Sequence, residues 1–289
     1  MPKYTSFTNS FHINEVINSN YFSTENPIVM GILNITTDSF YDGGKYITEK
    51  EIIQQVKKML DEGAKIIDIG AQSTRPGADL ITAKEELRKL LPIIKLLKNK
   101  FPGIIISIDT FWAEVAEKCI QEGANMINDI SAGKIDEKIL EIIAKFKTPY
   151  ILMHMQGIPL NMQDNPCYNN ISIEVFSFFK KRIKLLHEKG INNIILDPGF
   201  GFGKNLEHNY QLLNKLKKFQ EFKLPILIGV SRKSMIYSAL ETTPDNALNG
   251  TTIVNTIALL NGASILRVHD VKEAYECIKI TKLAKSNNY

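Results

Sequence analysis

The sequence has few of the features that mark several large classes of protein. Its three cysteines, Cys119, Cys167 and Cys277, lie far apart, are odd in number and show no C-x-x-C spacing. Neither a disulfide framework nor a zinc site is therefore expected, and a reducing, cytoplasmic setting fits. The net charge is only +4, from 35 basic and 31 acidic residues in 289, so no nucleic-acid partner is expected.

Long apolar stretches are also missing. No apolar run reaches the roughly 20 residues that a membrane helix needs, so no membrane association is expected. The first residues, MPKYTSFTNSFHIN, lack the apolar core of a secretory signal. No low-complexity tract or Pro/Ser-rich linker divides the chain, which favours a single domain.

Short, β-branched apolar segments recur along the chain with helical patterns between them. Most are apolar without alternation, which indicates strands buried on both faces of a parallel sheet. The segments are Ile28–Ile35, Lys65–Gly70, Ile104–Asp109, Asn125–Ile130, Pro149–Met155, Asn193–Asp197, Pro225–Val230 and Ala263–Val268. The fold class predicted is α/β: a single-domain TIM (β/α)8 barrel over residues 28–289. Residues 1–27 are expected to form an N-terminal arm or a cap on the barrel bottom.

Three local signals predict details of the helices. Within Glu49–Glu62 the apolar residues form one stripe, and Gly63 should end that helix. Thr82 and Glu85 have the spacing of a capping box. Pro92 falls inside the helix that follows and predicts a kink or a restart.

Polar residues stand near the C-terminal tips of several predicted strands, namely Asp68, Asp109, Asn128 and Asp197. Carboxylates that face a pocket are costly unless they are paired or hydrogen-bonded. Each could simply cap the next helix, but four together favour a site for a ligand rich in N–H donors, such as a 2-amino-4-oxo heterocycle. Asn34, at the first tip, could hold Mg²⁺ through its amide oxygen or could merely cap a turn.

A basic group follows the last two strands. Arg267 and His269 are two residues apart on a strand, so their side chains point the same way and can hold one ligand. The loops after strands seven and eight usually bind phosphate in this fold, and Ser231-Arg232-Lys233 follows strand seven. We therefore interpret these residues as an anion-binding corner rather than as surface charges.

Three other segments leave their roles open. The glycine-rich segment Asp197–Asn205 fails the phosphate-loop pattern, and its glycines would let the backbone pass close to a flat ligand, with Phe200 or Phe202 as an apolar wall. Arg75 lies in the second of two long polar loops, where it could close over an anion or be a solvated residue of a Pro-Gly turn. His154 ends strand five and could be structural.

Eight segments resemble, in order and spacing, the motifs of the dihydropteroate synthase family. They are MGILNITTDSF, STRPGA, SIDT, INDI, LMHMQG, LDPGFGFGKN, GVSRKSM and LRVHDV, and they run from about Ile28 to the C-terminal region. The resemblance implies a TIM barrel, usually a homodimer and a sulfonamide target, that acts in folate biosynthesis. It would join p-aminobenzoate to 6-hydroxymethyl-7,8-dihydropterin pyrophosphate, giving 7,8-dihydropteroate and pyrophosphate, with Mg²⁺.

The resemblance also implies roles for individual residues. The pterin is assigned to Asp109, Asn128, Asp197 and Lys233. Pyrophosphate is assigned to Asn34 (through the metal), Thr74, Arg75, Arg267 and His269. The p-aminobenzoate pocket is assigned to Phe40, Pro76, Phe202, Ser231 and Lys233. The catalytic group is Asp109, Lys233, Arg267 and His269.

Two alternative functions share parts of this pattern. A pterin-dependent methyltransferase module would have the same barrel and pterin-facing residues, but it would not need the anion corner. A Schiff-base aldolase would use Lys233 as its amine. The sequence also departs from the family at Thr37, Ala71-Gln72 and Phe111-Trp112, and the first two departures concern the two long loops.

Overall fold

The computed structural model describes residues 22–35, 48–72 and 80–286. Eight parallel strands form one sheet in the order β6-β5-β4-β3-β2-β1-β8-β7. An isolated parallel bridge between Leu196 and Ile226 joins the two ends of this order, so the sheet closes into a barrel. The predicted TIM barrel is confirmed.

The strands match the predicted segments, and all but β2, which begins one residue earlier, are shorter than predicted. They are β1 (Ile28–Asn34), β2 (Ala64–Gly70), β3 (Ile105–Asp109), β4 (Met126–Asp129), β5 (Tyr150–Met153), β6 (Ile194–Asp197), β7 (Leu227–Ile228) and β8 (Ile265–Val268). The greatest shortening is at β7, where Pro225 lacks an N–H for the ladder and Val230 already belongs to the loop that carries Ser231.

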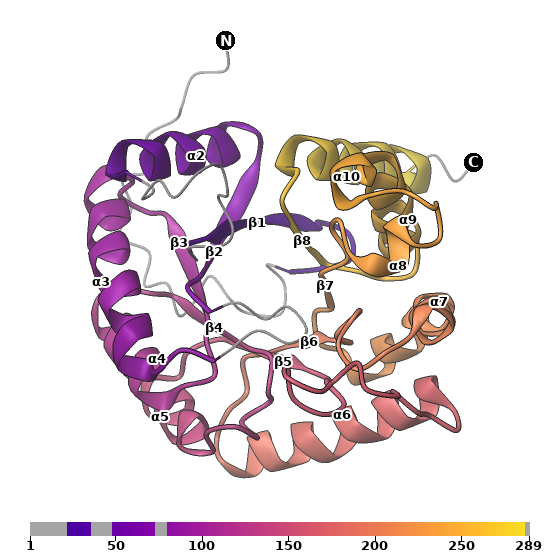
Figure 1. Ribbon diagram of the computed structural model, residues 1–289, viewed down its shortest axis with the longest axis horizontal. Helices are drawn as coiled ribbons and strands as arrows, with labels where there is room; N and C mark the ends of the chain where they lie inside the picture. Colours follow the sequence, from indigo (N-terminus) through magenta and orange to yellow (C-terminus); the bar gives the residue numbers. More distant parts are fainter. Residues whose placement is uncertain (1–21, 36–47, 73–79, 287–289) are drawn as a thin grey trace.

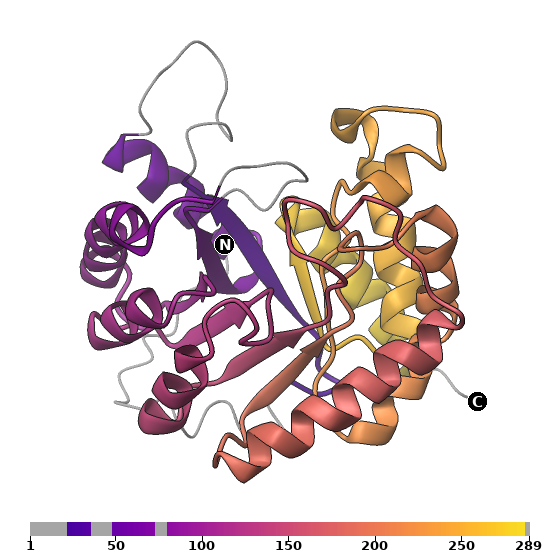
Figure 2. The same ribbon diagram turned by 60° about the horizontal axis from the view of Figure 1, so that its bottom comes forward.

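Helices surround the barrel on the outside of the strands (Figures 1 and 2). They are α2 (Glu49–Asp61), α3 (Ala83–Lys100), α4 (Ala113–Gln121), α5 (Lys138–Phe146), α6 (Ile171–Glu188), α7 (Leu206–Asn214), α8 (Ser234–Tyr237), α9 (Leu248–Leu260) and α10 (Val271–Ser286), with 3-10 turns η1 (Leu216–Phe222) and η2 (Pro244–Asn246). Within the described ranges, no helix is both long and apolar enough to cross a membrane.

The local helix signals are largely confirmed. The capping box of Thr82 and Glu85 opens α3, and Gly63, with a φ of +113°, follows the end of α2. The restart at Pro92 is wrong, because α3 continues through it from Ala83 to Lys100. Both Pro92 and Arg88, whose carbonyl loses its N–H partner, lie on the exposed side of the helix, where water can bond that carbonyl.

Side chains alternate between the two faces of the barrel wall. The outward-facing residues pack against the helices in the largest core cluster. The inward-facing residues of the lower barrel form a second apolar cluster of Phe22, Met30, Ile66, Met126, Ile151, Ile195, Leu227 and Ile265. A TIM barrel is filled by layers of side chains in this way, with each layer taken from alternate strands.

Phe22, the first described residue, belongs to this interior cluster and is almost fully buried. Residues 1–21 lie outside the described residues. The interpretation of residues 1–27 as an arm or a cap on the barrel bottom therefore stays a prediction.

Candidate active site

Above the apolar layers, the barrel interior becomes polar. The even-numbered strands each place one apolar residue in the lower interior: Ile66, Met126, Ile195 and Ile265. Two positions further along the same strands, and so on the same face, stand Asp68, Asn128, Asp197 and Arg267. Three of the four predicted tip residues, Asp68, Asn128 and Asp197, thus lie in one layer with Arg267, because strand alternation directs them to the same face. The fourth, Asp109, ends β3 and is joined to this layer by its hydrogen bond with Arg267.

Arg267 is the centre of this layer. Its Nε donates to Asp68 Oδ2 at 2.7 Å, and a terminal nitrogen donates to Asp109 Oδ2 at 2.7 Å. Asn128 Nδ2 donates to the same Asp68 oxygen at 3.1 Å. The Asp68 side chain is 0% exposed and that of Arg267 is 17% exposed, so these are buried, charge-assisted hydrogen bonds.

Several acceptors of this layer have no protein donor in the described part of the chain. Asp68 Oδ1, Asn128 Oδ1 and Ser107 Oγ are buried and make no hydrogen bond. A buried polar atom without a partner costs free energy, and in native structures such atoms require a specific explanation. At the mouth of a barrel, they provide acceptors for the N–H groups of a ligand.

Burial shifts the pKa values of the charged groups at the mouth of the barrel. Burial raises the pKa of Asp109 to about 7, and the Asp68 charge acts in the same direction, while Arg267 opposes both. Burial also raises the pKa of Asp197. Burial lowers the pKa of Lys233 to about 8, against the attraction of Asp197. Perturbed titratable groups gathered at one cleft are typical of an active site.

Lys233 joins the pterin-assigned residues to the predicted aromatic wall. Its Nζ donates to the carbonyl oxygen of Phe200 at 2.6 Å and lies 4.4 Å from the centroid of the Phe202 ring. Phe202 therefore lies at the mouth, as expected. Phe200 does not, because its side chain is fully buried in the outer core.

The glycine-rich segment packs against protein and not only against a ligand. A Cβ on Gly199 would lie 1.9 Å from the carbonyl oxygen of His154, and one on Gly203 would lie 2.4 Å from that of Gln156. Both glycines also have positive φ. These two glycines are therefore needed for the close approach of the segment to the end of β5, which corrects the ligand-approach interpretation for both.

The predicted anion corner is partly assembled. Ser231 Oγ lies 3.1 Å from His269 Nδ1 and accepts from the His269 backbone N–H at 3.2 Å. His269 keeps an exposed edge, while burial on the barrel side and the neighbouring Arg267 lower the pKa of its imidazole. Arg232, in contrast, makes a bidentate pair with Asp270 at 2.9 and 2.7 Å and so fastens two loops together.

Comparison with known proteins agrees with this geometry. The sequence matches the pterin binding enzyme family over residues 30–269. Dihydropteroate synthase of Escherichia coli (strain K12) is 43% identical over 262 residues, which cover 90% of this chain and 92% of the relative. The chain belongs to the dihydropteroate synthase family.

Solved structures of the family have the same fold. The Yersinia pestis dihydropteroate synthase in a sulfonamide drug complex superposes with a TM-score of 0.86 at 43% identity, covering 91% of this chain and 96% of that one. The Xanthomonas albilineans enzyme with 4-aminobenzoic acid gives 0.84 at 36% identity, covering 91% and 94%. The chain is therefore an enzyme, and the methyltransferase and aldolase alternatives are set aside.

Of the remaining residues that the family resemblance assigns to the site, only Asn34 lies within the described residues. Phe40, Thr74, Arg75 and Pro76 lie outside the described residues, as do most of the two long loops. Asn34 ends β1 opposite Gly70, and a Cβ on Gly70 would lie 3.6 Å from Asn34 Oδ1 and 3.7 Å from Asp109 Oδ2. Asn34 and Asp109 thus face the same glycine at the mouth.

The family resemblance assigns no role to three buried charged residues near the site. Asp68 is predicted from its position as one of the tip residues that favour a ligand site, and Lys204 only as part of the glycine-rich segment. No sequence pattern used above predicts a role for Glu86. Glu86 accepts from Thr110 Oγ1 at 3.0 Å, and burial raises its pKa to about 8. It shares the buried face of α3 with apolar residues, and a charged residue on such a stripe is the signal that could have revealed it.

Proposed function

We propose that this chain condenses 6-hydroxymethyl-7,8-dihydropterin pyrophosphate with p-aminobenzoate, giving 7,8-dihydropteroate and pyrophosphate. The observation that carries the proposal is the polar interior layer with its unpaired acceptors. A 2-amino-4-oxo pterin presents several N–H donors along one edge. Asp109, Asn128 and Asp197 offer acceptors for that edge, Asp68 lies beside them, and Lys233 offers a donor for the pterin's acceptor atoms.

The chemistry demands little of the protein as a base. The reaction breaks the bond between the pterin methylene carbon and a pyrophosphate oxygen and forms a bond from that carbon to the amine nitrogen, which then loses a proton. An arylamine is neutral and nucleophilic near pH 7. The difficult step is departure of pyrophosphate, which leaves positive charge on the pterin. The Asp109 carboxylate, held in place by Arg267, supports that charge through fixed electrostatics.

The anion corner would receive the leaving pyrophosphate. Arg267 and His269 are assigned to it, together with Thr74 and Arg75 from outside the described residues. The neutral imidazole of His269 can donate one hydrogen bond, and it can gain a proton beside an arriving anion. The p-aminobenzoate pocket would adjoin this corner through Phe202, Ser231 and Lys233, with Phe40 and Pro76 completing it.

The magnesium proposal fits these residues only in a limited form. Among the described residues, no group of three or more His, Cys, Asp or Glu side chains is placed to hold a metal. Asn34 supplies one amide oxygen, the ligand type that Mg²⁺ prefers, and Mg²⁺ often keeps waters and binds mainly through substrate phosphates. The ion would neutralise charge on the departing pyrophosphate, and Asn34 would orient it.

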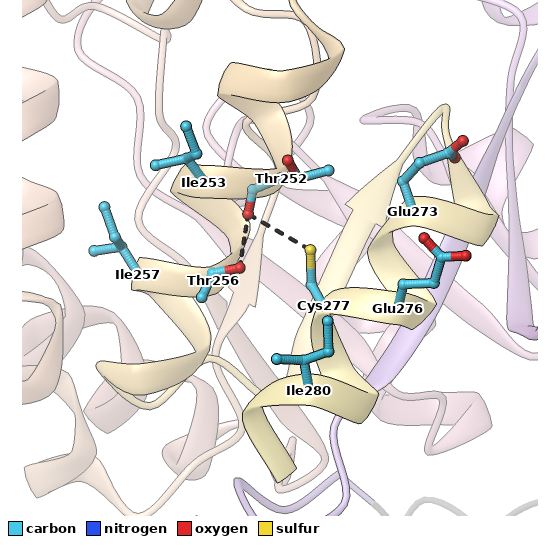
Figure 3. A pocket seen from close by; sticks show the side chains of 8 residues that line it. All are labelled: Thr252, Ile253, Thr256, Ile257, Glu273, Glu276, Cys277 and Ile280. Atoms are coloured by element: carbon cyan, nitrogen blue, oxygen red, sulfur yellow. Dashed lines mark hydrogen bonds between the residues drawn. The ribbon is translucent and has the colours of Figure 1, made fainter. Parts of the chain in front are cut away.

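A homodimer is proposed on a separate observation. The outer face of α9 and α10 exposes Ile253, Ile257 and Ile280, at 51%, 38% and 66%. Figure 3 shows these side chains around a groove between the two helices, with Cys277 donating to the carbonyl oxygen of Thr252 at its base. Contiguous exposed apolar residues of this kind mark association surfaces, and a two-fold dimer would cover the same face on both subunits.

A cytoplasmic location is proposed from the cysteines. All three are free thiols, and Cys167 is exposed. An exposed free thiol is suited to a reducing compartment.

One assay tests the proposed reaction. Purified protein is mixed with the pterin pyrophosphate, p-aminobenzoate and Mg²⁺, and pyrophosphate and dihydropteroate are measured together. We expect equimolar release that depends on p-aminobenzoate and is suppressed by a sulfonamide. Pyrophosphate release that is indifferent to p-aminobenzoate would indicate hydrolysis and contradict the proposal.

A further inference from the structure

Lys204 lies in a cage of acceptors beneath the pterin-assigned residues. Its side chain is almost fully buried, at 3% exposure. Its Nζ donates to the carbonyl oxygens of Gly199 at 2.8 Å and Phe202 at 3.0 Å, and it lies 3.1 Å from His154 Nδ1. The carbonyl oxygen of His154 is further away, at 3.4 Å.

The number of near acceptors around Lys204 Nζ matches the number of N–H donors of an ammonium group. Lysine has three N–H donors and no acceptor, and the three nearest partners are two carbonyl oxygens and one ring nitrogen. This match makes His154 Nδ1 an acceptor and places the imidazole proton on Nε2. Burial and the nearby Lys204 hold the pKa of His154 far below its ordinary value, so the ring stays neutral and able to accept.

The cage is connected to Asp197 through the backbone of one residue, Gly199. The N–H of Gly199 donates to Asp197 Oδ1 at 2.8 Å, while Lys204 binds the carbonyl oxygen of the same residue. The segment between them is held from the other side by Lys233, which binds the carbonyl oxygen of Phe200. Lys204 thus fixes the backbone on which the orientation of the Asp197 carboxylate depends.

The charge of Lys204 is also linked to Asp197. Burial lowers the pKa of Lys204 to about 7, and the Asp197 carboxylate acts against that shift while Lys233 adds to it. In return, Lys204 is one of the cations that favour the ionised form of Asp197. Hydrogen-bonding geometry and charge therefore connect the same two residues.

We infer that Lys204 is a positioning residue for the pterin site, which orients Asp197 through the backbone of Gly199 while His154 serves as its fixed acceptor. The inference rests on the proposed function, because it takes the pterin as the ligand of Asp197. Lys204 itself touches no substrate in this account. Its effect reaches the pterin through Asp197 alone.

Lys98 offers a matched control at the opposite end of the barrel. It is a partly buried lysine that, like Lys204, has a lowered pKa, and its Nζ donates to the Ile104 carbonyl oxygen at 3.0 Å and to Asn125 Oδ1 at 2.9 Å. These partners lie at the amino ends of β3 and β4, away from the mouth. Lys98→Met and Lys204→Met both remove an ammonium group that donates to a backbone carbonyl oxygen and to a side-chain acceptor, Asn125 Oδ1 or His154 Nδ1.

The experiment is a double-mutant cycle on the full-length protein. Calorimetry measures the affinity of 6-hydroxymethylpterin, which carries no phosphate, for wild type, Lys204→Met, Asp197→Asn and the double variant, and thermal unfolding is recorded for each. We expect Lys204→Met to weaken pterin binding about 10-fold, a typical cost of a displaced buried hydrogen bond. In the Asp197→Asn background the same change should have little further effect, since residues that act through one another are not additive. Lys98→Met should lower the unfolding temperature and leave pterin affinity unchanged.

Each outcome decides a different point. Equal losses from Lys204→Met in both backgrounds, or unchanged pterin affinity despite reduced stability, would overturn the inference and leave Lys204 as a merely structural residue. If Lys204→Met does not fold, His154→Phe takes its place in the cycle, because it removes the Nδ1 acceptor and retains a ring beside Phe178, and a smaller non-additive loss is expected. If wild type binds no pterin at all, the proposed function fails and the cycle has no ligand to report on.

Discussion

Asp68 on β2 and Asp129 on β4 are both fully buried carboxylates of the barrel wall, yet their surroundings differ completely. Asp129 faces outward from β4, and its two oxygens accept four hydrogen bonds, from the Ser131 N–H and hydroxyl, the Gly133 N–H and the Tyr150 hydroxyl. Asp68 faces inward from β2. It shares one oxygen between Asn128 and Arg267, and its other oxygen has no partner in the described part of the structure.

The difference shows which kind of buried carboxylate indicates a site. Burial raises the pKa of Asp129 as it does that of Asp109, so a perturbed pKa does not separate the structural residue from the functional one. The two kinds of residue are separated by how many of their acceptor positions are filled by hydrogen bonds. A carboxylate with all its acceptor positions filled fixes a loop, whereas one with open acceptors beside a cation is prepared for a ligand.

The largest effect on the site is expected when the Arg267 guanidinium is removed. Arg267→Ala leaves Asp68 and Asp109 buried without their partner, and breaking a buried pair typically costs about 3–5 kcal/mol. We expect turnover to fall at least about 100-fold. Binding of a phosphate-free pterin, measured by calorimetry, should weaken as well, because the guanidinium orders its acceptors. Loss of pyrophosphate binding alone would mean that Arg267 belongs only to the anion corner.

A smaller effect is expected when one acceptor is changed to a donor. Asp197→Asn places an amide where the pterin's N–H groups need an oxygen. The unsatisfied buried partners should cost roughly 2–4 kcal/mol of pterin affinity, about 30- to 1000-fold in Kd. Titration calorimetry with a pterin ligand measures this directly, and unchanged affinity would refute the assignment of Asp197.

The dependence of kcat/KM on pH tests the roles of Asp109 and Lys233 without a mutation. The pKa of Asp109 is raised to about 7, so this carboxylate gains a proton as the pH falls below 7 and can no longer support the positive pterin. Lys233, with its pKa lowered to about 8, loses its proton as the pH rises above 8. We expect kcat/KM for the pterin substrate to be bell-shaped with a maximum between these values. A flat profile from pH 6 to 9 would contradict both roles.

The smallest effect on catalysis is expected far from the mouth. Ile280→Lys places a charge on the exposed apolar face of α9 and α10. Analytical ultracentrifugation should show a shift from dimer to monomer, while pterin affinity changes less than about threefold, because no residue of the polar layer touches this face. Lys279→Glu, next along α10, is the control that changes the charge of this face without loss of an apolar residue. A wild type that is monomeric at micromolar concentration would remove the dimer proposal.

The sequence predicted the barrel and much of its mouth for a simple physical reason. Parallel strands have a two-residue period and a common end, so Asp68, Asn128, Asp197 and Arg267 could be assigned to one rim from position alone. The positions of these residues in the sequence do not show which side chains form ion pairs or hydrogen bonds with one another. Nothing in the sequence shows that Arg267 bridges Asp68 and Asp109, that Arg232 instead binds Asp270, or that Lys204 is enclosed by its own segment.

The errors have a similar origin. Pro92 was expected to kink or restart α3 because local propensity favours a break, but the helix does not restart, because an exposed position tolerates the lost hydrogen bond. Gly199 was interpreted as making room for a ligand, because sequence does not show that the carbonyl oxygen of His154 lies against it. Solvent exposure decided the first outcome, and a tertiary contact between distant segments decided the second.

The most direct test of the account compares pterin binding by Asp68→Asn and Asp129→Asn. Both variants replace a buried carboxylate by an amide of the same shape, and both should lower the unfolding temperature. Calorimetric titration with 6-hydroxymethylpterin should show at least a tenfold loss of affinity, about 1.4 kcal/mol or more, for Asp68→Asn and wild-type affinity for folded Asp129→Asn. Equal affinities in the two variants, or a greater loss for Asp129→Asn, would contradict the claim that open acceptors at the barrel mouth form the pterin site.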